Sequence, residues 1–442
     1  MLTGIAILYL LIGVFLALFK RGKYVLPYIL FLNIYSAWLT DFVFPLEQGD
    51  HNIFDGVSKY FTYFCFVLYF FRRRTKDMDF SLLYVFILTA VYFILIYVLR
   101  GAGPVVGLKY AVSTFGSVLF FLVLFILTPS KKQVRSLVKW NLLIQLVIGG
   151  FQFLGLFHFH MNIGESFVGT DFITGSFTRN NIYSEVISLL LILQCIFDYK
   201  DYGRLSLKSL VIIVFVISIV IGTGVRTALL ADVIVLAWMF YTYNKEKPFF
   251  KVKFVVGICI IGMLTFSVFK LANQDAMIRD RDTGDSIERQ LNGLREISDR
   301  DNLELSTIGL SIILWSYFIQ NPVIGPGLYF TSTSGYGGIV AEDTANSTDV
   351  SILLFMCEVG LIGVFLFILL YGVALLRYNN SKGPFVVFLY LLMISVTDAG
   401  FWGYSYVIYL YISIYYDNWQ SLQIKKSSLA AKTSFQKDVQ LV

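Results

Sequence analysis

The run VSILLFMCEVGLIGVFLFILLYGVALL, residues 350–376, decides the fold of this chain, because Glu358 is its only charged residue. The hydrocarbon core of a bilayer is about 30 Å thick, and a helix of about 20 apolar residues crosses it. Inside lipid the backbone must satisfy its own hydrogen bonds, which a helix does within one segment. The run therefore predicts a membrane-spanning helix.

The rest of the chain has the same character. Hydrophobic residues make up 57% of it and charged residues 14%, and its mean hydropathy is +0.72. These values exclude an ordinary soluble domain. The sequence predicts an all-α polytopic integral membrane protein with about 12 to 13 spanning helices. The further apolar segments are centred on residues 2–19, 25–39, 57–71, 80–99, 107–128, 138–156, 182–197, 207–221, 227–243, 254–271, 384–396 and 403–415.

Basic residues sort the loops into two sets. Most of the 35 lysines and arginines follow every second predicted span, in residues 20–23, 72–76, 131–139, 200–208, 245–253, 377–382 and 425–437. By the positive-inside rule these loops are cytoplasmic, which places the N-terminus outside and the C-terminal tail inside. The net charge of +6 is then a topology signal and a poor argument for nucleic-acid binding.

One long polar segment, residues 271–348, interrupts the spans on the predicted outer side. Inside it, residues 305–320 predict an apolar helix at the outer interface, which Asn321 and Pro322 end because proline cannot continue a helix. The predicted units are the N-terminal membrane helices, an extracytoplasmic loop with short helices, the C-terminal membrane helices and a cytoplasmic tail. Their boundaries are 1–270, 271–348, 349–417 and 418–442.

Two arginines at outer helix ends are candidate ligands for phosphate. Arginine is costly near a span, about 2.5–3.5 kcal/mol at mid-membrane, so its presence suggests a partner or a ligand. Arg226, in IGTGVRTALLADVIV, stands at a tight turn between two spans. A guanidinium binds phosphate oxygens in pairs and stays charged; alternatively, Arg226 reaches the interface or pairs with Asp232. Arg179 has a similar position beside Asn181, and an interfacial anchor explains it equally well.

Further candidates lie in or next to the polar segment. Asp349 stands at the outer entrance of the following span, where a desolvated carboxylate serves as a general base or, alternatively, as a helix cap. Glu358 lies deeper in the same span, and it is interpreted either as a substrate ligand or as a structural acid paired with another side chain. Arg289 and Arg295 alternate with acidic residues. This pattern is typical of ion pairs along a helix face, and substrate binding is the alternative. Tyr329 offers a ring that stacks on sugar or joins the interfacial aromatic belt.

The sequence gives little support for a metal site, a nucleotide-driven pump or a familiar hydrolase. His158 and His160 are two residues apart and make a weak metal pattern, so no metal or other cofactor is expected. The sequence contains no P-loop, no GxSxG and no HExxH motif, which argues against a nucleotide-driven pump and the familiar hydrolases.

The segments WSYFIQNPVIGPGLYF (315–330) and STDVSILLFMCEVGLIGVFLFILLYG (347–372) together resemble the O-antigen polymerase and ligase superfamily. The matching positions are Asn321, Pro322, Gly325, Gly327, Phe330, Glu358, Gly360 and Gly363. GVRTALL (224–230) resembles the family's Ser-Arg-x-x-Leu-Leu hairpin, and GSFTRNNIYS (175–184) resembles another of its motifs. The resemblance covers about residues 170–376.

Departures from the family pattern separate its members. Ligases usually carry a His-Asn pair at the start of the span after the loop, and that His position falls on Asp349 here. An arginine common before the loop tryptophan is replaced by Ser311. Both differences favour a polymerase. The family's usual arrangement has the N-terminus inside, which differs from the arrangement that the basic loops predict.

The resemblance implies a glycosyltransferase of the GT-C kind in the bacterial cytoplasmic membrane, with its active site facing the exterior or periplasm. It would join undecaprenyl-pyrophosphate-linked repeat units into O-antigen, capsule or exopolysaccharide by metal-independent, inverting transfer. Arg226 and Arg179 would hold the pyrophosphate, and Asp349 would act as base. The implied partners are the lipid-linked donor and acceptor, membrane lipids and a chain-length regulator protein. An O-antigen ligase and a lipid-linked oligosaccharide flippase are the alternatives; a flippase predicts polar residues along a central path.

Overall fold

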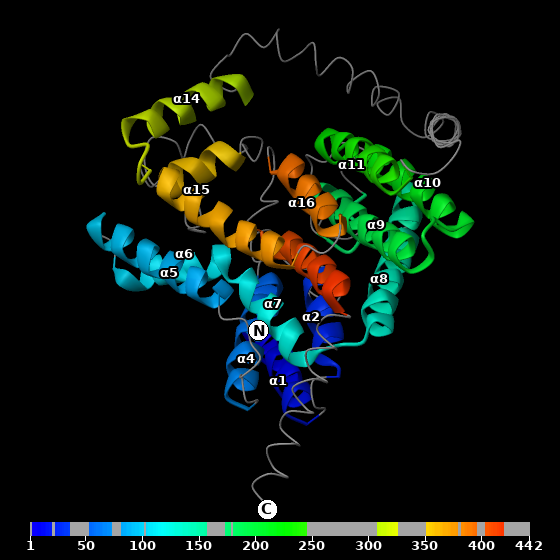
Figure 1. Ribbon diagram of the computed structural model, residues 1–442, viewed down its shortest axis with the longest axis horizontal. Helices are drawn as coiled ribbons and strands as arrows, with labels where there is room; N and C mark the ends of the chain where they lie inside the picture. Colours follow the sequence, from blue (N-terminus) through cyan, green and yellow to red (C-terminus); the bar gives the residue numbers. More distant parts are fainter. Residues whose placement is uncertain are drawn as a thin grey trace, which may run out of the picture.

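The computed structural model describes eleven segments of the chain. The described residues are 2–19, 23–35, 53–72, 81–100, 103–156, 173–177, 180–244, 307–325, 351–378, 382–395 and 403–419. These residues form helices and short connections, and they contain no strand. The predicted all-α fold class is therefore confirmed for this part of the chain (Figure 1).

The first half of the fold comprises α1 (Leu2–Phe19), α2 (Val25–Ile34), α4 (Ile53–Arg72), α5 (Ser81–Leu99), α6 (Pro104–Phe115), α7 (Ser117–Leu127) and α8 (Lys131–Phe153). The second half comprises α9 (Asn180–Tyr202), α10 (Leu207–Gly222), α11 (Arg226–Asn244), α14 (Thr307–Gln320), α15 (Ser351–Tyr378) and α16 (Gly383–Ile394). Residues 404–419 form a last helix. As predicted, α14 ends directly before Asn321 and Pro322.

Four of the described helices are long and apolar enough to cross a membrane: α5, α8, α9 and the part of α15 from Phe355 to Leu376. The pair α6 and α7 makes a fifth if it counts as one bent span, and six apolar helices are shorter, at 10–17 residues. The chain thus has the helices of a membrane protein. The finer prediction of about 12 to 13 spans stays a prediction, and residues 254–271 lie outside the described part.

The predicted single span over residues 107–128 is two helices, bent by 57° at Gly116. The hydroxyl of Tyr63, from α4, donates a hydrogen bond to the Val112 carbonyl at 2.7 Å. A side chain at position 116 would overlap that hydroxyl. The bend therefore accommodates a tyrosine from a neighbouring helix, which the hydropathy of the segment cannot indicate.

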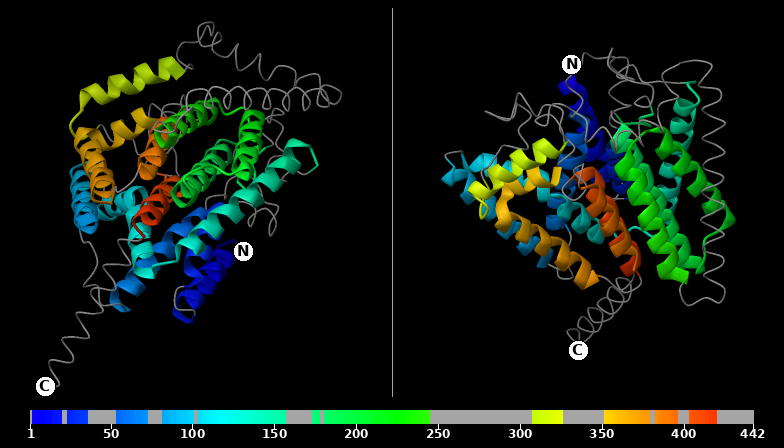
Figure 2. Two further views of the ribbon diagram at one scale, coloured as in Figure 1. Left: turned by 45° about the vertical axis from the view of Figure 1, so that its right-hand side comes forward. Right: turned by 90° about the horizontal axis from the view of Figure 1, so that it is seen from above.

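Helix α9 is the most enclosed of the four candidate spans, and every residue from Tyr183 to Tyr199 is buried. It packs against α8, α10, α11 and α16, and Figure 2 shows these helices grouped together in both views. Peripheral helices differ, because residues such as Leu11 and Phe15 of α1 and Leu95 of α5 are exposed. Exposed apolar faces of this extent are typical of a surface that contacts lipid.

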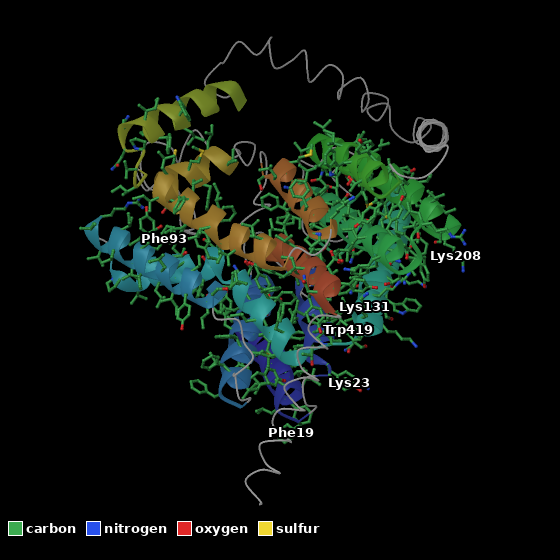
Figure 3. The ribbon with its side chains drawn as sticks, in the orientation of Figure 1. Phe19, Lys23, Phe93, Lys131, Lys208 and Trp419 are labelled. Carbon is green, nitrogen blue, oxygen red and sulfur yellow. The ribbon has the colours of Figure 1, made fainter. Side chains whose placement is uncertain are left out.

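The helix ends next to the basic loops contact one another. Lys200 Nζ lies 2.6 Å from Asp417 Oδ1, and Gln133 donates a hydrogen bond to the Lys23 carbonyl at 3.0 Å. The indole of Trp419 donates to the Pro129 carbonyl at 3.2 Å. Figure 3 labels Lys23, Lys131 and Trp419 in this region. These contacts join ends that the positive-inside rule assigns to one side.

Candidate functional site

The first part of the candidate site is a break in α15 at Gly360. This residue has φ 65° and ψ −176°, so the helix is interrupted there. The N–H groups that follow the break donate to the turn after α14: Leu361 to the Pro322 carbonyl at 2.9 Å and Ile362 to the Val323 carbonyl at 3.1 Å. The turn therefore supplies the hydrogen-bond acceptors that the interrupted helix lacks. We call this contact the turn–kink junction; it comprises residues 321–325 and 357–362.

Glycine is required on both sides of the turn–kink junction. Gly325 has φ 75°, in the left-handed region that favours glycine, as Gly360 does. A Cβ atom on Gly325 would overlap the carbonyl of Cys357, and one on Gly360 would overlap the backbone of Ile324. Two motif glycines thus permit close approach of two backbones.

Arg100, at the end of α5, closes the turn–kink junction. Its Nη2 lies 2.6 Å from the Ile324 carbonyl oxygen, 2.9 Å from that of Gly325 and 3.1 Å from that of Glu358. Its Nη1 lies 3.7 Å from Glu358 Oε1, which also accepts a hydrogen bond from the Tyr97 hydroxyl. One guanidinium therefore binds both segments of the junction and the carboxylate between them.

The carboxylate of Glu358 is enclosed. Its side chain has no exposed surface, and that of Arg100 is 14% exposed. Buried charges are stable only when they are paired and hydrogen-bonded, and Arg100 with Tyr97 meets that need. The arrangement favours the paired structural acid among the two interpretations of Glu358, and its role as a substrate ligand stays a prediction.

The second part of the candidate site joins the start of α9 to the turn between α10 and α11. The Asn180 side chain donates a hydrogen bond to the Thr223 carbonyl at 3.0 Å. Gly224 follows with φ 71°, and Arg226 is the first residue of α11. We call this contact the hairpin junction; it comprises residues 180–181 and 223–226. The two sequence segments that suggested a phosphate site therefore lie side by side.

Two glutamines of α8 hold the chain before α9. Gln152 Oε1 accepts hydrogen bonds from the N–H groups of Thr174 at 3.1 Å and Gly175 at 2.7 Å. Gln145 Nε2 donates to Ser176 Oγ at 2.6 Å, and Ser176 Oγ donates to the Ile34 carbonyl at 2.5 Å. These buried side chains supply hydrogen-bond partners for a short segment that belongs to no helix. They fix residues 174–176 against α8 and α2.

The predicted site residues fall into two groups. Asn181 is half-buried at the start of α9, where its Oδ1 accepts from the Ile182 N–H at 2.9 Å. Arg226 begins α11, and its side chain is outside the described part of the structure. Glu358 lies in the turn–kink junction. Five further predicted residues lie outside the described residues: Arg179, Arg289, Arg295, Tyr329 and Asp349. Their roles stay predictions.

The sequence interpretation missed Arg100, which donates to three carbonyl groups of the turn–kink junction. The sequence did contain a signal for Arg100: it directly follows an apolar run, just as Arg226 directly precedes one. The cost of a charge at a span end applies to both. Its partners were not predictable, since they lie more than 220 residues away along the chain.

Within the described residues, no three histidine, cysteine, aspartate or glutamate side chains lie close enough together to hold a metal ion. Comparison with known proteins adds no assignment: no protein-family model, no curated protein and no solved structure matches the sequence.

Proposed function

We propose that the protein is a membrane glycosyltransferase that polymerises undecaprenyl-pyrophosphate-linked oligosaccharide repeat units into a surface polysaccharide. The polar segment 271–348 would face the exterior of the bacterial cytoplasmic membrane and cover the reacting ends of two lipid-linked glycans. O-antigen, capsule and exopolysaccharide are the candidate products.

One observation supports this proposal most strongly: the motif segments contact one another in pairs. Residues 321–325 dock on the break at Gly360, and Asn180 binds the turn that leads to Arg226. Residues that only terminate separate helices have no need of such contacts. The pairing supports the view that each pair of motifs builds one local structure at helix ends.

The proposed chemistry uses Arg226 of the hairpin junction, Arg179 directly before it, and Asp349 directly after the polar segment 271–348. A sugar hydroxyl of the acceptor attacks the anomeric carbon of the donor from the face opposite the pyrophosphate. The bond between that carbon and the pyrophosphate oxygen breaks, and the lipid pyrophosphate leaves. Arg226 and Arg179 stabilise the charge on the leaving group, and Asp349 accepts the proton of the hydroxyl. Exclusion of water by the loop limits hydrolysis of the donor.

The turn–kink junction has a supporting role in this scheme. It anchors the end of α14 to α15, and α15 begins two residues after Asp349. A fixed distance between the loop helix and the following span would keep the base in register with the donor site. Arg100 and Glu358 are therefore proposed as positioning residues.

A flippase is the second candidate, because buried polar contacts join helices inside the bundle. The Tyr35 hydroxyl donates to Asn141 Oδ1 at 3.1 Å, and the Thr62 and Tyr404 hydroxyls share a hydrogen bond of 2.5 Å. The sequence alone did not indicate such an interior. These contacts give a lipid-linked glycan carrier some of the polar path that it would need.

Purified protein tests the polymerase directly. Lipid-linked repeat units, extracted from cells that lack the protein, are incubated with it in detergent and a metal chelator. Polymerisation predicts a ladder of longer lipid-linked glycans from the wild type. Arg226→Ala and Asp349→Asn should give none, while each elutes as a folded protein on size exclusion. The polymerase is rejected in favour of the flippase if the wild type elongates no glycan in this assay but moves the repeat units across the bilayer after reconstitution into vesicles.

A further inference from the structure

The starts of α8 and α10 meet beside the end of α9, on the side of the basic loops. Arg135 of α8 and Ser209 of α10 both contact the carboxylate of Asp198 on α9. Figure 3 labels Lys131 and Lys208, which stand at these two helix starts. The basic residues next to Arg135 on α8 and next to Ser209 on α10 therefore belong to one region of the surface.

The acidic residues of this region are already neutralised. Asp198 is paired with Arg135, and Asp201 is paired with both Arg135 and Lys131. Four further basic side chains nearby are exposed: Lys132, Lys139, Arg204 and Lys208. None of the ion pairs between described side chains includes any of these four. The region thus presents positive charge that the described acidic side chains do not balance.

The exposed charge continues into apolar surface on both helices. Residues three, four or seven positions apart share one face of a helix. One such exposed stripe follows α8, through Lys132, Lys139, Trp140, Ile144, Val147 and Phe151. Another follows α10, through Lys208, Val211 and Phe215. Both stripes are basic at the end next to Asp198 and apolar beyond it.

The two parts of each stripe select the partner. The apolar part suits acyl chains, and tryptophan and lysine near a helix end reach the headgroup layer of a bilayer. An acidic soluble protein or a free phosphate could pair with the lysines, but neither would cover the apolar part. Basic residues between helices on the cytoplasmic side suit the headgroups of anionic lipids. We propose that the stripes of α8 and α10 form a binding site for an anionic phospholipid, with its phosphate at Lys132, Lys139 and Lys208.

A lipid in this site would join two helices that both pack against α9. The other end of α9 carries Asn180 of the hairpin junction. A bound lipid would therefore stabilise the helices that position that junction. The proposal does not depend on glycan polymerisation, and it applies equally to a transporter.

Thermal unfolding of the purified protein in detergent tests the lipid site. The midpoint is measured after addition of phosphatidylglycerol, phosphatidylcholine or glycerol 3-phosphate. Because a ligand that binds only the folded state stabilises it, phosphatidylglycerol should raise the midpoint by about 2 °C or more above the value in phosphatidylcholine. Glycerol 3-phosphate carries the charge without acyl chains and should have no effect. An equal rise with phosphatidylcholine or with glycerol 3-phosphate would overturn the proposal.

Two matched variants assign the response to the stripes. Lys139→Gln with Lys208→Gln removes one charge from each stripe and should lose at least half of the difference between the two lipids. The control is Lys59→Gln with Lys109→Gln, which removes the same charge from the first halves of α4 and α6. The control should keep the full difference. Equal losses in both double variants, or a full difference in the first, would contradict the assignment.

Brominated lipids locate the bound molecule, because bromine quenches tryptophan fluorescence at close range. Trp140 is 60% exposed and lies one position after Lys139 on the stripe of α8. Brominated phosphatidylglycerol should quench the wild type more than brominated phosphatidylcholine does, and Trp140→Phe should lose this excess. An excess that persists in Trp140→Phe would place the lipid elsewhere and overturn the proposed site.

Discussion

The two sides of the helix bundle use buried charge differently. On the side of the basic loops, Arg135 pairs with Asp198 and Lys200 pairs with Asp417, so that each pair joins two helices. At the turn–kink junction, Arg100 directs most of its contacts to backbone carbonyls. The first arrangement holds helices together. The contacts of Arg100 fix one particular backbone conformation, and a functional site needs its backbone and side chains held in one geometry.

Removal of Arg100 should have the largest effect. Arg100→Ala removes the cation beside the buried Glu358 carboxylate and the donor to three carbonyl groups. Breaking a buried pair in this way costs about 3–5 kcal/mol. Denaturant unfolding in detergent measures the loss. A double variant, Arg100→Ala with Glu358→Gln, should recover part of it; equal losses in both would contradict the role given to the pair.

The glycine of the kink should come next. Gly360→Ala introduces a side chain at positive φ that also overlaps the backbone of Ile324, and we expect a loss of about 3 kcal/mol. Gly372→Ala, in the same helix, is the control because nothing lies within 4 Å of the added carbon. There alanine should be neutral or stabilising by up to about 1 kcal/mol. Similar unfolding midpoints for the two variants would show that the kink is not constrained.

The glutamine contacts should have an intermediate effect. Gln152→Ala leaves two buried N–H groups of residues 174–175 without their acceptor, which costs about 2 kcal/mol. Gln133→Ala serves as the comparison, since its single bond to the Lys23 carbonyl is exposed. Hydrogen exchange should rise at residues 174–176 in the first variant alone. Unchanged exchange there would mean that the segment is held by other contacts.

The smallest effect is expected on the side of the basic loops. The Arg135 side chain is 21% exposed, and Asp198 keeps the hydrogen bonds from Ser209 and Gln194. Arg135→Ala should therefore cost about 1 kcal/mol and lose most of that cost at high salt. Stability is compared in low and high NaCl. A loss as large as that of Arg100→Ala would remove the distinction between the two sides.

The sequence predicted the parts of this fold that depend on local chemistry. Apolar runs marked the helices, and Asn321 with Pro322 marked the end of α14. The contact of Arg100 with Glu358 joins distant segments, so neither run alone contains the information. The contact of Ser188 on α9 with Asp232 on α11 was not predictable for another reason. Helix α9 is buried on all sides, and its periodicity does not indicate which neighbour Ser188 faces.

The surface glycan of cells that lack the protein tests the central claim most directly. Its chain length is compared after complementation with the wild type and with Arg226→Ala, with both proteins present at equal amounts in the membrane. The polymerase predicts single repeat units on the surface of the deletion and Arg226→Ala cells, and long chains after complementation with the wild type. Long chains retained on the lipid carrier, or repeat units trapped inside the cell, would contradict it.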